Sequence, residues 1–543
     1  MNKIIISLLV ALLAAAEAVA LPAQKLLYPG DWAYDALAVL AQEQGLVFFA
    51  DSTLTVSQLN NMLDEIDDET LSPSGQRLRR QLREYLAAPP LYAYQSDAIE
   101  AGVDVEVTTE AFVKSNSAVP WIHDNYERRP LFVAPLTLSF GSWLTAGLDP
   151  QFAENEKTTL RNDNYTNIPI DLAPEFDLHF PKRAYLSIGI PFGKASGVYF
   201  SIGIGENFYG RTRTGSILLS DYMDRVSFGR LSLFSPNLRY GAEIMQLEAT
   251  KYLYMHYLQL RLFKRLTLSF TEGMMVNAPL ELRYLNPLMV FHNLEPWKTY
   301  DDYNEDLGNG DTPAEPTGET RAGAFFGTKI EYQLGKYIRL YGLLGLSQLQ
   351  LPIEREHWED DLTPDALAFQ LGTEASLPAW DGYWRFGLEG VYTYPYMYLK
   401  WDKGWSYYKE STQVDNMTLR QWTGTPFGPD SIAGTLWAGY EVPRSWSLTL
   451  SFLFAAQGEL SSTDIFNTEK YRSSPEVADV VKPLTGTPTY TSTISLKGTW
   501  SPYSWIHLML QPGYRIINNY DHESGKTEHG FELALSVQVL PGK

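Results

Sequence analysis

Hydrophobic and polar residues alternate at every second position from about residue 103 to the C-terminus, and this period constrains the fold more than any other feature. The clearest example is residues 253–275, LYMHYLQLRLFKRLTLSFTEGMM. If residues 263–265 form the turn, Leu262 faces Leu266, and the other leucines also share one face of the hairpin. The polar residues, Arg261 among them, then share the opposite face. The pattern predicts a long antiparallel hairpin with one apolar and one polar face.

The same alternation recurs along the chain, with short turns and long polar loops in strict succession. We expect turns near 263–265, 335–337, 379–382, 442–445 and 501–503, and long loops near 349–365, 401–431, 458–488 and 518–528. Strands of about ten residues joined in this way are typical of transmembrane β-barrels. A soluble β-sandwich would alternate too, but it would not need such uniformly long strands. The sequence therefore predicts a mainly β protein, a transmembrane antiparallel β-barrel of about 16–18 strands.

The N-terminus and the composition agree with an exported protein. Residues 1–20 contain Lys3, then an apolar run and the small-residue pattern Ala18-Val19-Ala20, as in a secretory signal peptide. The chain has no Cys, so without disulfides its stability must come from size or from a closed hydrogen-bond ladder. The formal net charge of −21 argues against nucleic acid as a partner.

Residues 30–88 have a helical period instead. Asp31 can cap a helix that ends at Gln44 before Gly45, and Thr55 begins a capping box that is followed by a second apolar stripe. A third helix is predicted from Ser72. We expect a signal peptide at 1–20, a periplasmic helical segment at 21–95 and an outer-membrane barrel at 96–543.

Residues 277–320 interrupt the barrel pattern. The run LRYLNPLMVFHNL inside this range looks like a strand, but counting it as a spanning strand would move the acidic residues that follow to the periplasmic side. Pro287, which follows Asn286, cannot donate a hydrogen bond to a sheet. We therefore expect one long extracellular loop whose apolar part folds into the barrel mouth.

The run GIGENFYGRTRTGSILLSD, residues 203–221, resembles a phosphate-binding glycine loop. Its glycines do not have the dinucleotide spacing, and no helix start follows them, so strand ends and bends near the rim or lumen are favoured. Arg211 and Arg213 have the same parity and could point to one side of an extended segment. In a barrel lumen they would pair with carboxylates or bind an anionic ligand.

Two patterns could indicate catalysis or a metal. The hairpin register places His256 opposite Glu272, either as a structural pair at the rim or as a catalytic pair, and the sequence contains no G-x-S-x-G nucleophile motif. The acidic run from Asp302 imitates a calcium loop, but its glycine, Gly308, comes one place late and Pro313 replaces the twelfth-position glutamate. We favour the structural pair and expect no enzymatic activity, no cofactor and no metal.

The loop after residue 400 is rich in aromatic residues among polar ones, with Trp405, Tyr407, Tyr408 and Trp422. Aromatic faces beside polar groups suit sugar rings. The alternative is an aromatic girdle at the membrane boundary.

A helical N-terminus followed by a large barrel resembles the family of Wzi-type capsule-assembly outer-membrane proteins. The resemblance is strongest over about 195–345, in GRTRTGSILLSD (210–221), in residues 255–272 and in YLNPLMVF (284–291). It implies a lectin-like, non-enzymatic barrel with periplasmic helices that retains a capsular-type polysaccharide. The expected partners are this surface polysaccharide, outer-membrane lipid and lipopolysaccharide, and the barrel-assembly machinery. The alternative is a porin or solute channel with a periplasmic helical cap, and the two differ in whether the lumen is open.

Overall fold

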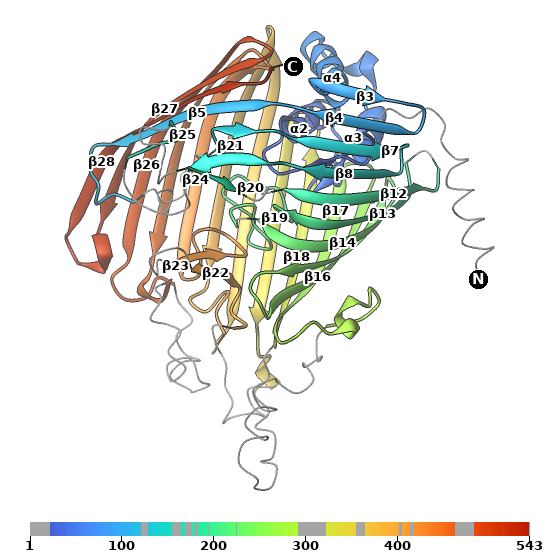
Figure 1. The fold of residues 1–543 in the computed structure, drawn as a ribbon. Helices are drawn as coiled ribbons and strands as arrows, with labels where there is room; N and C mark the ends of the chain where they lie inside the picture. The colour runs from blue at the N-terminus through green and yellow to red at the C-terminus, as the bar shows by residue number, and fades with distance from the viewer. Residues whose placement is uncertain are drawn as a thin grey trace.

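A computed structural model describes residues 22–541, except 121–128, 155–163, 169–175, 180–182, 194, 224, 292–321, 354–363, 401–403, 413–417 and 462–482. The expected signal peptide and the calcium-like run at 302–313 therefore lie outside the described residues. Figure 1 shows a barrel with helices at one end and long loops at the other. We call these the turn end and the loop end.

The barrel wall is one antiparallel sheet of 24 strands within the described residues. Its strands are β3 (Tyr92–Gln95), β4 (Ile99–Val103), β5 (Glu106–Lys114), β6 (Phe132–Val133), β7 (Leu136–Phe140), β8 (Leu144–Leu148), β9 (Gln151–Glu154), β10 (Tyr165–Thr166), β11 (Phe176–His179), β12 (Ala184–Pro191), β13 (Gly197–Gly205), β14 (Val226–Phe234), β15 (Leu238–Gln246), β16 (Lys251–Leu262), β17 (Leu266–Asn277), β18 (Ala322–Leu334), β19 (Ile338–Gln348), β20 (Ala366–Ala379), β21 (Gly382–Thr393), β24 (Ser431–Val442), β25 (Trp446–Gln457), β26 (Thr489–Tyr503), β27 (Ile506–Asn518) and β28 (Thr527–Val539). A separate hairpin is formed by β22 (Tyr408–Thr412) and β23 (Thr418–Trp422).

The last strand pairs with an early one, which closes the sheet. β28 is antiparallel to β5, from Glu532 opposite Lys114 to Val539 opposite Val107. The pairs β4 and β5, β6 and β7, β8 and β9, and β11 and β12 each follow one another along a single barrel strand. With each pair counted once, and the short β3 and β10 set aside, the described residues form eighteen barrel strands. The predicted fold class, an antiparallel barrel of about 16–18 strands, is confirmed.

The alternation of apolar and polar residues explains why the outer face of the barrel wall is apolar. Outward side chains of the long strands are apolar and exposed, for example Leu258, Phe270, Ile330, Leu371, Leu436, Leu450, Ile494 and Leu510. The registers around the 263–265 and 335–337 turns are those predicted. The last turn, predicted at 501–503, lies instead between Tyr503 and Ile506, because the pairing of β26 with β27 shifts just before it.

Three helices occupy the turn end: α2 (Trp32–Gln44), α3 (Val56–Asp64) and α4 (Pro73–Leu86), with a 3-10 turn, η1, at Asp68–Thr70. Their caps are those predicted, with Asp31 accepting from Ala33 N and Thr55 forming a capping box with Gln58. The two-residue strands β1 (Leu26–Leu27) and β2 (Leu54–Thr55) pair beside them. In the described part of the chain, no helix is both long and apolar enough to cross a bilayer.

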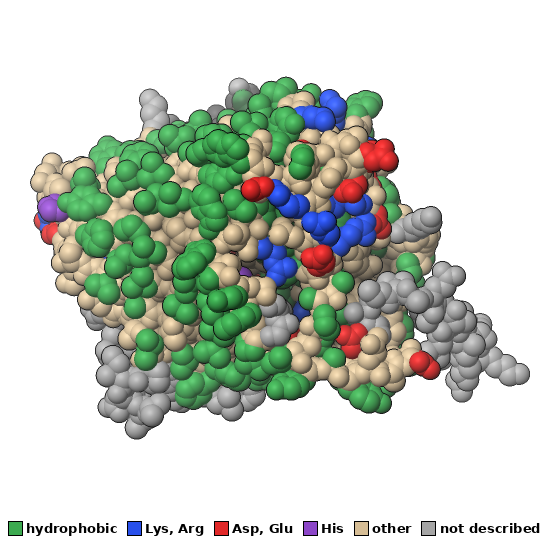
Figure 2. All heavy atoms as spheres, turned by 90° about the horizontal axis from the view of Figure 1, so that it is seen from above, with side chains coloured by type: hydrophobic (Ala, Val, Ile, Leu, Met, Phe, Trp, Pro, Cys, Tyr) green, Lys and Arg blue, Asp and Glu red, His purple; other side chains and the backbone are tan. Residues whose placement is uncertain are grey.

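The helical segment, residues 22–91, contacts the turns of the barrel directly. Tyr337 N donates to Gln42 O at 2.6 Å, and Val47 N donates to Lys264 O at 2.9 Å. Gly45 ends α2 with φ +77, and a Cβ on it would lie 2.7 Å from Gly335 O. Only glycine combines this left-handed conformation with so close an approach. Figure 2 looks down on this end and shows charged side chains gathered over the helical part.

A chain of buried charges joins the helical segment to the lumen wall. Asp51 lies 2.9 Å from Lys329 Nζ, and the same amine lies 2.9 Å from Glu331. Glu331 lies 2.8 Å from Arg339, which lies 3.0 Å from Glu374. Buried charges persist only when paired in this way, so the network fixes the position of the helical segment against β18 and β19.

The described part of the 277–320 loop lies elsewhere than predicted. Residues 278–291 pack on the outer face of β16 and β17, where Figure 1 shows them in yellow-green beside the wall. Tyr284 stacks on the outward ring of Tyr254, with centroids 4.8 Å apart. The prediction that this apolar part folds into the barrel mouth is wrong, because its partners, Tyr254 and Met274 among them, have outward parity.

Candidate functional site

Part of the lumen is occupied by the chain itself. Residues 206–223, which we call the lumen segment, leave the end of β13 and fold inside the barrel. Tyr209 and Leu219 form a β-bridge, and Ile217 O accepts a hydrogen bond from Tyr398 Oη at 2.8 Å. Gly210 has φ +86 and its N–H donates to Asp51 O at 2.9 Å. The glycines here bend the chain, as the sequence favoured, and the lumen segment is fixed from both ends of the barrel.

The two arginines of this segment point in different directions, because the segment is bent and not extended. Arg211 forms an ion pair with Asp35 of α2, so it belongs to the junction between the lumen segment and the helices. The Asp35 carboxyl also lies 3.7 Å from Arg385. Burial raises the pKa of Asp35, but these guanidiniums and that of Arg213 more than offset it and hold the pKa below its usual value.

Arg213 has a different environment. Its N–H and that of Thr214 donate to the Glu389 carboxylate at 2.8 and 2.9 Å, which fixes the backbone. Its guanidinium lies 5.1 Å from the ring centre of Trp437 and borders a cavity. Within the part of the chain that the structure describes, the Arg213 side chain has no hydrogen bond or ion pair. It is a cation available to a ligand.

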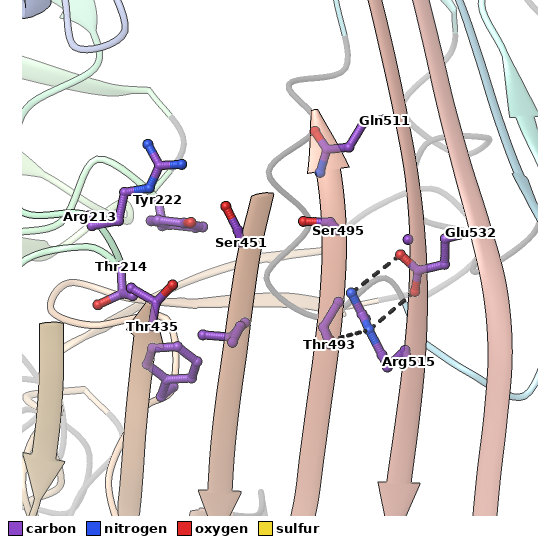
Figure 3. A pocket seen from close by; sticks show the side chains of 13 residues that line it. Arg213, Thr214, Tyr222, Thr435, Ser451, Thr493, Ser495, Gln511, Arg515 and Glu532 are labelled. Atoms are coloured by element: carbon purple, nitrogen blue, oxygen red, sulfur yellow. Dashed lines mark hydrogen bonds and ion pairs between the residues drawn. The ribbon is translucent and has the colours of Figure 1, made fainter. Parts of the chain in front are cut away.

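That cavity, which we call the lumen cleft, runs along the inner face of β24–β28 and is partly open to solvent, with about 640 Å³ of empty space that includes its open mouth. Figure 3 shows Arg213 and Thr214 on one side and wall side chains on the other. The lining residues are Arg213, Thr214, Tyr222, Phe427, Thr435, Ser451, Leu453, Thr493, Ser495, Gln511, Gly513, Arg515 and Glu532.

An ion pair forms the far wall of the lumen cleft. Arg515 Nε lies 3.1 Å from Glu532 and also donates to Thr493 Oγ1 at 3.1 Å (Figure 3). Gln511, two inward positions away on β27, has a buried Oε1 that accepts no hydrogen bond from the described residues. Buried acceptors without a donor are rare, so the cleft has an acceptor suited to a ligand hydroxyl.

The side chains that line the lumen cleft suit a ligand that is rich in hydroxyl groups. The wall contributes hydroxyl groups from Thr435, Ser451 and Ser495 of neighbouring strands, and Phe427 adds an apolar face. Arg515 and Glu532 balance one another, so Arg213 leaves the site with one net positive charge. Sugar rings combine hydroxyl edges with apolar C–H faces and match such a lining.

The wall residues of this cleft were not among the candidates that the sequence indicated. Alternation places Ser451 and Glu532 on the polar, lumen-facing side of their strands, and this signal was present. The alternation could not indicate which part of the lumen is left unfilled, because that depends on where the lumen segment and the loops fold.

The aromatic residues expected to stack on sugar have another role. Trp405 and Tyr407 are each 2% exposed and Tyr408 is 1% exposed, while Trp422 packs against the same core. The Tyr407 hydroxyl donates to Gly323 O. The sugar contact predicted for this loop is not supported by this burial, because the ring faces are covered by the lumen segment and the wall.

The remaining residues singled out from the sequence lie on the outer wall near the loop end. His256 faces Glu272 as predicted, and its ring lies 4.2 Å from that of Phe291. Asn286 Oδ1 accepts from Leu288 N at 3.1 Å, and Pro287 O accepts from Tyr240 Oη. These contacts fit a structural role. No cluster of three metal-ligating side chains occurs among the described residues.

The comparisons with known proteins support the fold. No family model and no curated protein matches the sequence. The structure is similar to Wzi, an outer-membrane protein involved in group 1 capsule assembly in Escherichia coli and described as a carbohydrate-binding β-barrel. The two share 13% identity over 94% of this chain and 98% of that one, with a TM-score of 0.57. The expected resemblance is therefore confirmed as a shared outer-membrane β-barrel fold.

Two channels match less well. OprD of Pseudomonas aeruginosa has a TM-score of 0.39 and 10% identity, over 81% of this chain and 95% of that one. The outer-membrane channel DcaP of Acinetobacter baumannii has a TM-score of 0.34 and 11% identity, over 82% of this chain and 98% of that one. Scores of this size carry no argument about function.

Proposed function

We propose that this chain is a non-enzymatic outer-membrane protein that binds a surface polysaccharide in the lumen cleft. The observation that carries the proposal is the cleft itself: hydroxyls, the Gln511 acceptor and the Arg213 cation line one side of a lumen whose other side holds the lumen segment. The Wzi structure, with the same fold, is described as carbohydrate-binding.

In this proposal the turn end and its helices face the periplasm, and the loop end faces outward. Short turns are periplasmic and long loops extracellular in bacterial outer-membrane barrels. The exposed leucines of the wall contact membrane lipid and lipopolysaccharide, and the barrel-assembly machinery inserts the chain. A secretory signal at residues 1–20 directs its export.

The alternative, a porin or solute channel, needs a continuous open path. The lumen segment and the helical segment stand against it, since Ile217, Leu218 and Leu219 are 0–4% exposed inside the barrel. The net charge of −21 would repel an acidic polysaccharide in general. Arg213 counters this locally, so the cleft accepts a neutral or an acidic sugar.

The test fills the cleft without altering the outside. Ser495 points into the cleft from β26, and Ile494, its neighbour in sequence, points outward and is 49% exposed. We expect Ser495→Trp to abolish binding of the purified protein to the source organism's surface polysaccharide, and Ile494→Trp to leave it unchanged. Heat-modifiable mobility in gels checks that both variants form barrels. Equal polysaccharide binding by the two variants would show that the cleft is not the binding site.

A further inference from the structure

A second cavity lies at the turn end, between α3 and the turns that join barrel strands. It is partly open to solvent and shares no lining residue with the lumen cleft. Its walls include Phe48, Met62 and Phe234, and the side chains of Arg239 and Arg261 reach it from the barrel. We call it the turn-end cavity.

The two arginines are neighbours on the inner face of the wall. Arg239 of β15 faces Gln259 of β16, and Arg261 comes two residues later on that strand. Side chains in this diagonal relation are about 7–8 Å apart at the backbone and within reach of each other's heads. Arg239 is 1% exposed and Arg261 is 3% exposed. Both are therefore almost completely removed from solvent.

Among the residues that the structure describes, neither guanidinium finds an acceptor for all its donors. Arg239 donates through Nη1 to Phe49 O at 3.1 Å and through Nε to Ser232 Oγ at 3.3 Å, which leaves Nη2 without an acceptor. Arg261 donates through Nη1 to Glu65 at 2.8 Å, which leaves both its Nε and its Nη2 without an acceptor. An unsatisfied buried donor costs about 1–3 kcal/mol, and more when it is charged.

The charges of the cavity do not cancel. The Glu65 carboxylate balances the charge of Arg261, and its Oε2 lies 2.8 Å from Arg261 Nη1. Arg239 has no ion pair within the residues the structure describes. One positive charge is therefore buried beside a cavity without a counter-charge, an arrangement that is unfavourable unless an anion completes it.

We propose that the turn-end cavity binds a small oxyanion, a carboxylate or phosphate group, between Arg239 and Arg261. Guanidinium N–H groups match the paired oxygens of such groups. The rings of Phe48 and Phe234 and the side chain of Met62 give the rest of the cavity apolar walls. A sugar acid would place its carboxylate on the arginines and its ring against these walls, while free phosphate would use the arginines alone.

The test uses the full-length protein in detergent at low salt, in an Arg213→Gln background that removes the cation of the lumen cleft. Inorganic phosphate, glucuronate and, as a neutral control, galactose are titrated by calorimetry. We expect phosphate or glucuronate to bind saturably and galactose not to bind. Tighter binding of glucuronate than of phosphate would indicate that the apolar walls contact a sugar ring. Tighter binding of phosphate would indicate a site for free phosphate. Either result supports the proposal.

Three variants separate binding from structure. Arg239→Gln should weaken anion binding at least about tenfold, since a charge-assisted hydrogen bond is lost. Glu65→Gln should strengthen it at least about tenfold, because it frees Arg261 and raises the net charge of the cavity by one. Arg83→Gln, which breaks the exposed pair with Asp64, is the control and should change nothing.

A purely structural role for the arginines would not make Glu65→Gln bind an anion more tightly. Absence of saturable binding by either anion at millimolar concentration overturns the proposal. So does unchanged affinity in both the Arg239→Gln and Glu65→Gln proteins. If Arg239→Gln fails to form a barrel, the Glu65→Gln comparison decides alone.

Discussion

Asp51 is the residue through which the helical segment is most firmly attached to the barrel. It is 4% exposed, and its carboxylate accepts from Lys329 Nζ at 2.9 Å and from Gln259 Nε2 at 2.9 and 3.0 Å. Its backbone oxygen accepts from Gly210 N at 2.9 Å. One side chain thus joins the helical segment to β16 and β18, and its backbone holds the lumen segment.

We predict that Asp51→Asn destabilises the docking of the helical segment by about 3 kcal/mol. Removing one partner of a buried pair costs about 3–5 kcal/mol, and the lower end applies because Lys329 keeps Glu331 at 2.9 Å. The amide keeps an acceptor oxygen but loses the negative charge that balances Lys329, and its NH₂ group can replace the oxygen that now accepts from Gln259 at 3.0 Å. A loss of about 3 kcal/mol raises the opening equilibrium about a hundredfold.

Hydrogen exchange of the backbone amides in residues 22–60, followed by mass spectrometry on the protein in nanodiscs, measures this opening. The Asp51→Leu/Lys329→Met double variant replaces the pair by apolar groups and should lie within about 1 kcal/mol of the natural protein. Asp64→Asn, which breaks an exposed pair with Arg83, is the control and should change exchange little. Exchange in Asp51→Asn within about twofold of the natural protein would refute the reasoning.

Three further predictions follow from single residues. Because the pKa of Asp35 is held below its usual value by Arg211, its contribution to docking is present above the unfolded pKa of about 3.9 and lost as the pH falls through the lower folded value. Asp35→Asn should therefore speed exchange in α2 at neutral pH and have no effect at pH values below the folded pKa. Gly210→Ala should loosen the lumen segment by about 1–2 kcal/mol, because φ is +86 and the new Cβ would lie 2.8 Å from Ser216 Oγ; faster exchange of the amides around Tyr209 measures it. Burial lowers the pKa of Lys400 in the loop after β21 from 10.5 to about 8, so stability should rise between these pH values, where only the unfolded chain holds the proton. Lys400→Met should abolish that rise in thermal unfolding, and an unchanged pH profile would contradict it.

Sequence alone could predict every feature that depends on local pattern. The odd-numbered turn at 263–265 fixes parity, and the observed register places His256 opposite Glu272 as expected. The helix limits follow from the capping oxygens of Asp31 and Thr55 and from the left-handed conformation of Gly45. These are short-range effects, and a single sequence contains them.

Features that depend on distant contacts could not be predicted. Alternation places Tyr254 on the outer face, but only the folded chain shows that Tyr284 covers it there. The aromatic loop looks like a surface platform in sequence, yet Tyr398 binds Ile217 O and Tyr407 binds Gly323 O inside the barrel. The last two contacts join residues 181 and 84 positions apart, and such tertiary packing has no local signal in the sequence.

Arg211 and Arg213 illustrate the same limit within one segment. Their parity predicts a shared direction, which holds only for an extended chain. The lumen segment bends at Gly210 and Gly215, both with positive φ, and sends Arg211 to Asp35 and Arg213 to the lumen cleft. Of the two alternatives left open by the sequence, Arg211 has the carboxylate partner, and a ligand for Arg213 stays a proposal.

The measurement that tests the account most directly combines conductance and binding on one preparation of the purified protein. In planar bilayers the protein should give no large steady conductance, because the lumen segment and the helical segment obstruct the path through the lumen. The same preparation should bind the source organism's surface polysaccharide saturably, and Arg213→Gln should weaken this binding. A large steady conductance without polysaccharide binding would contradict the account and identify the chain as a channel.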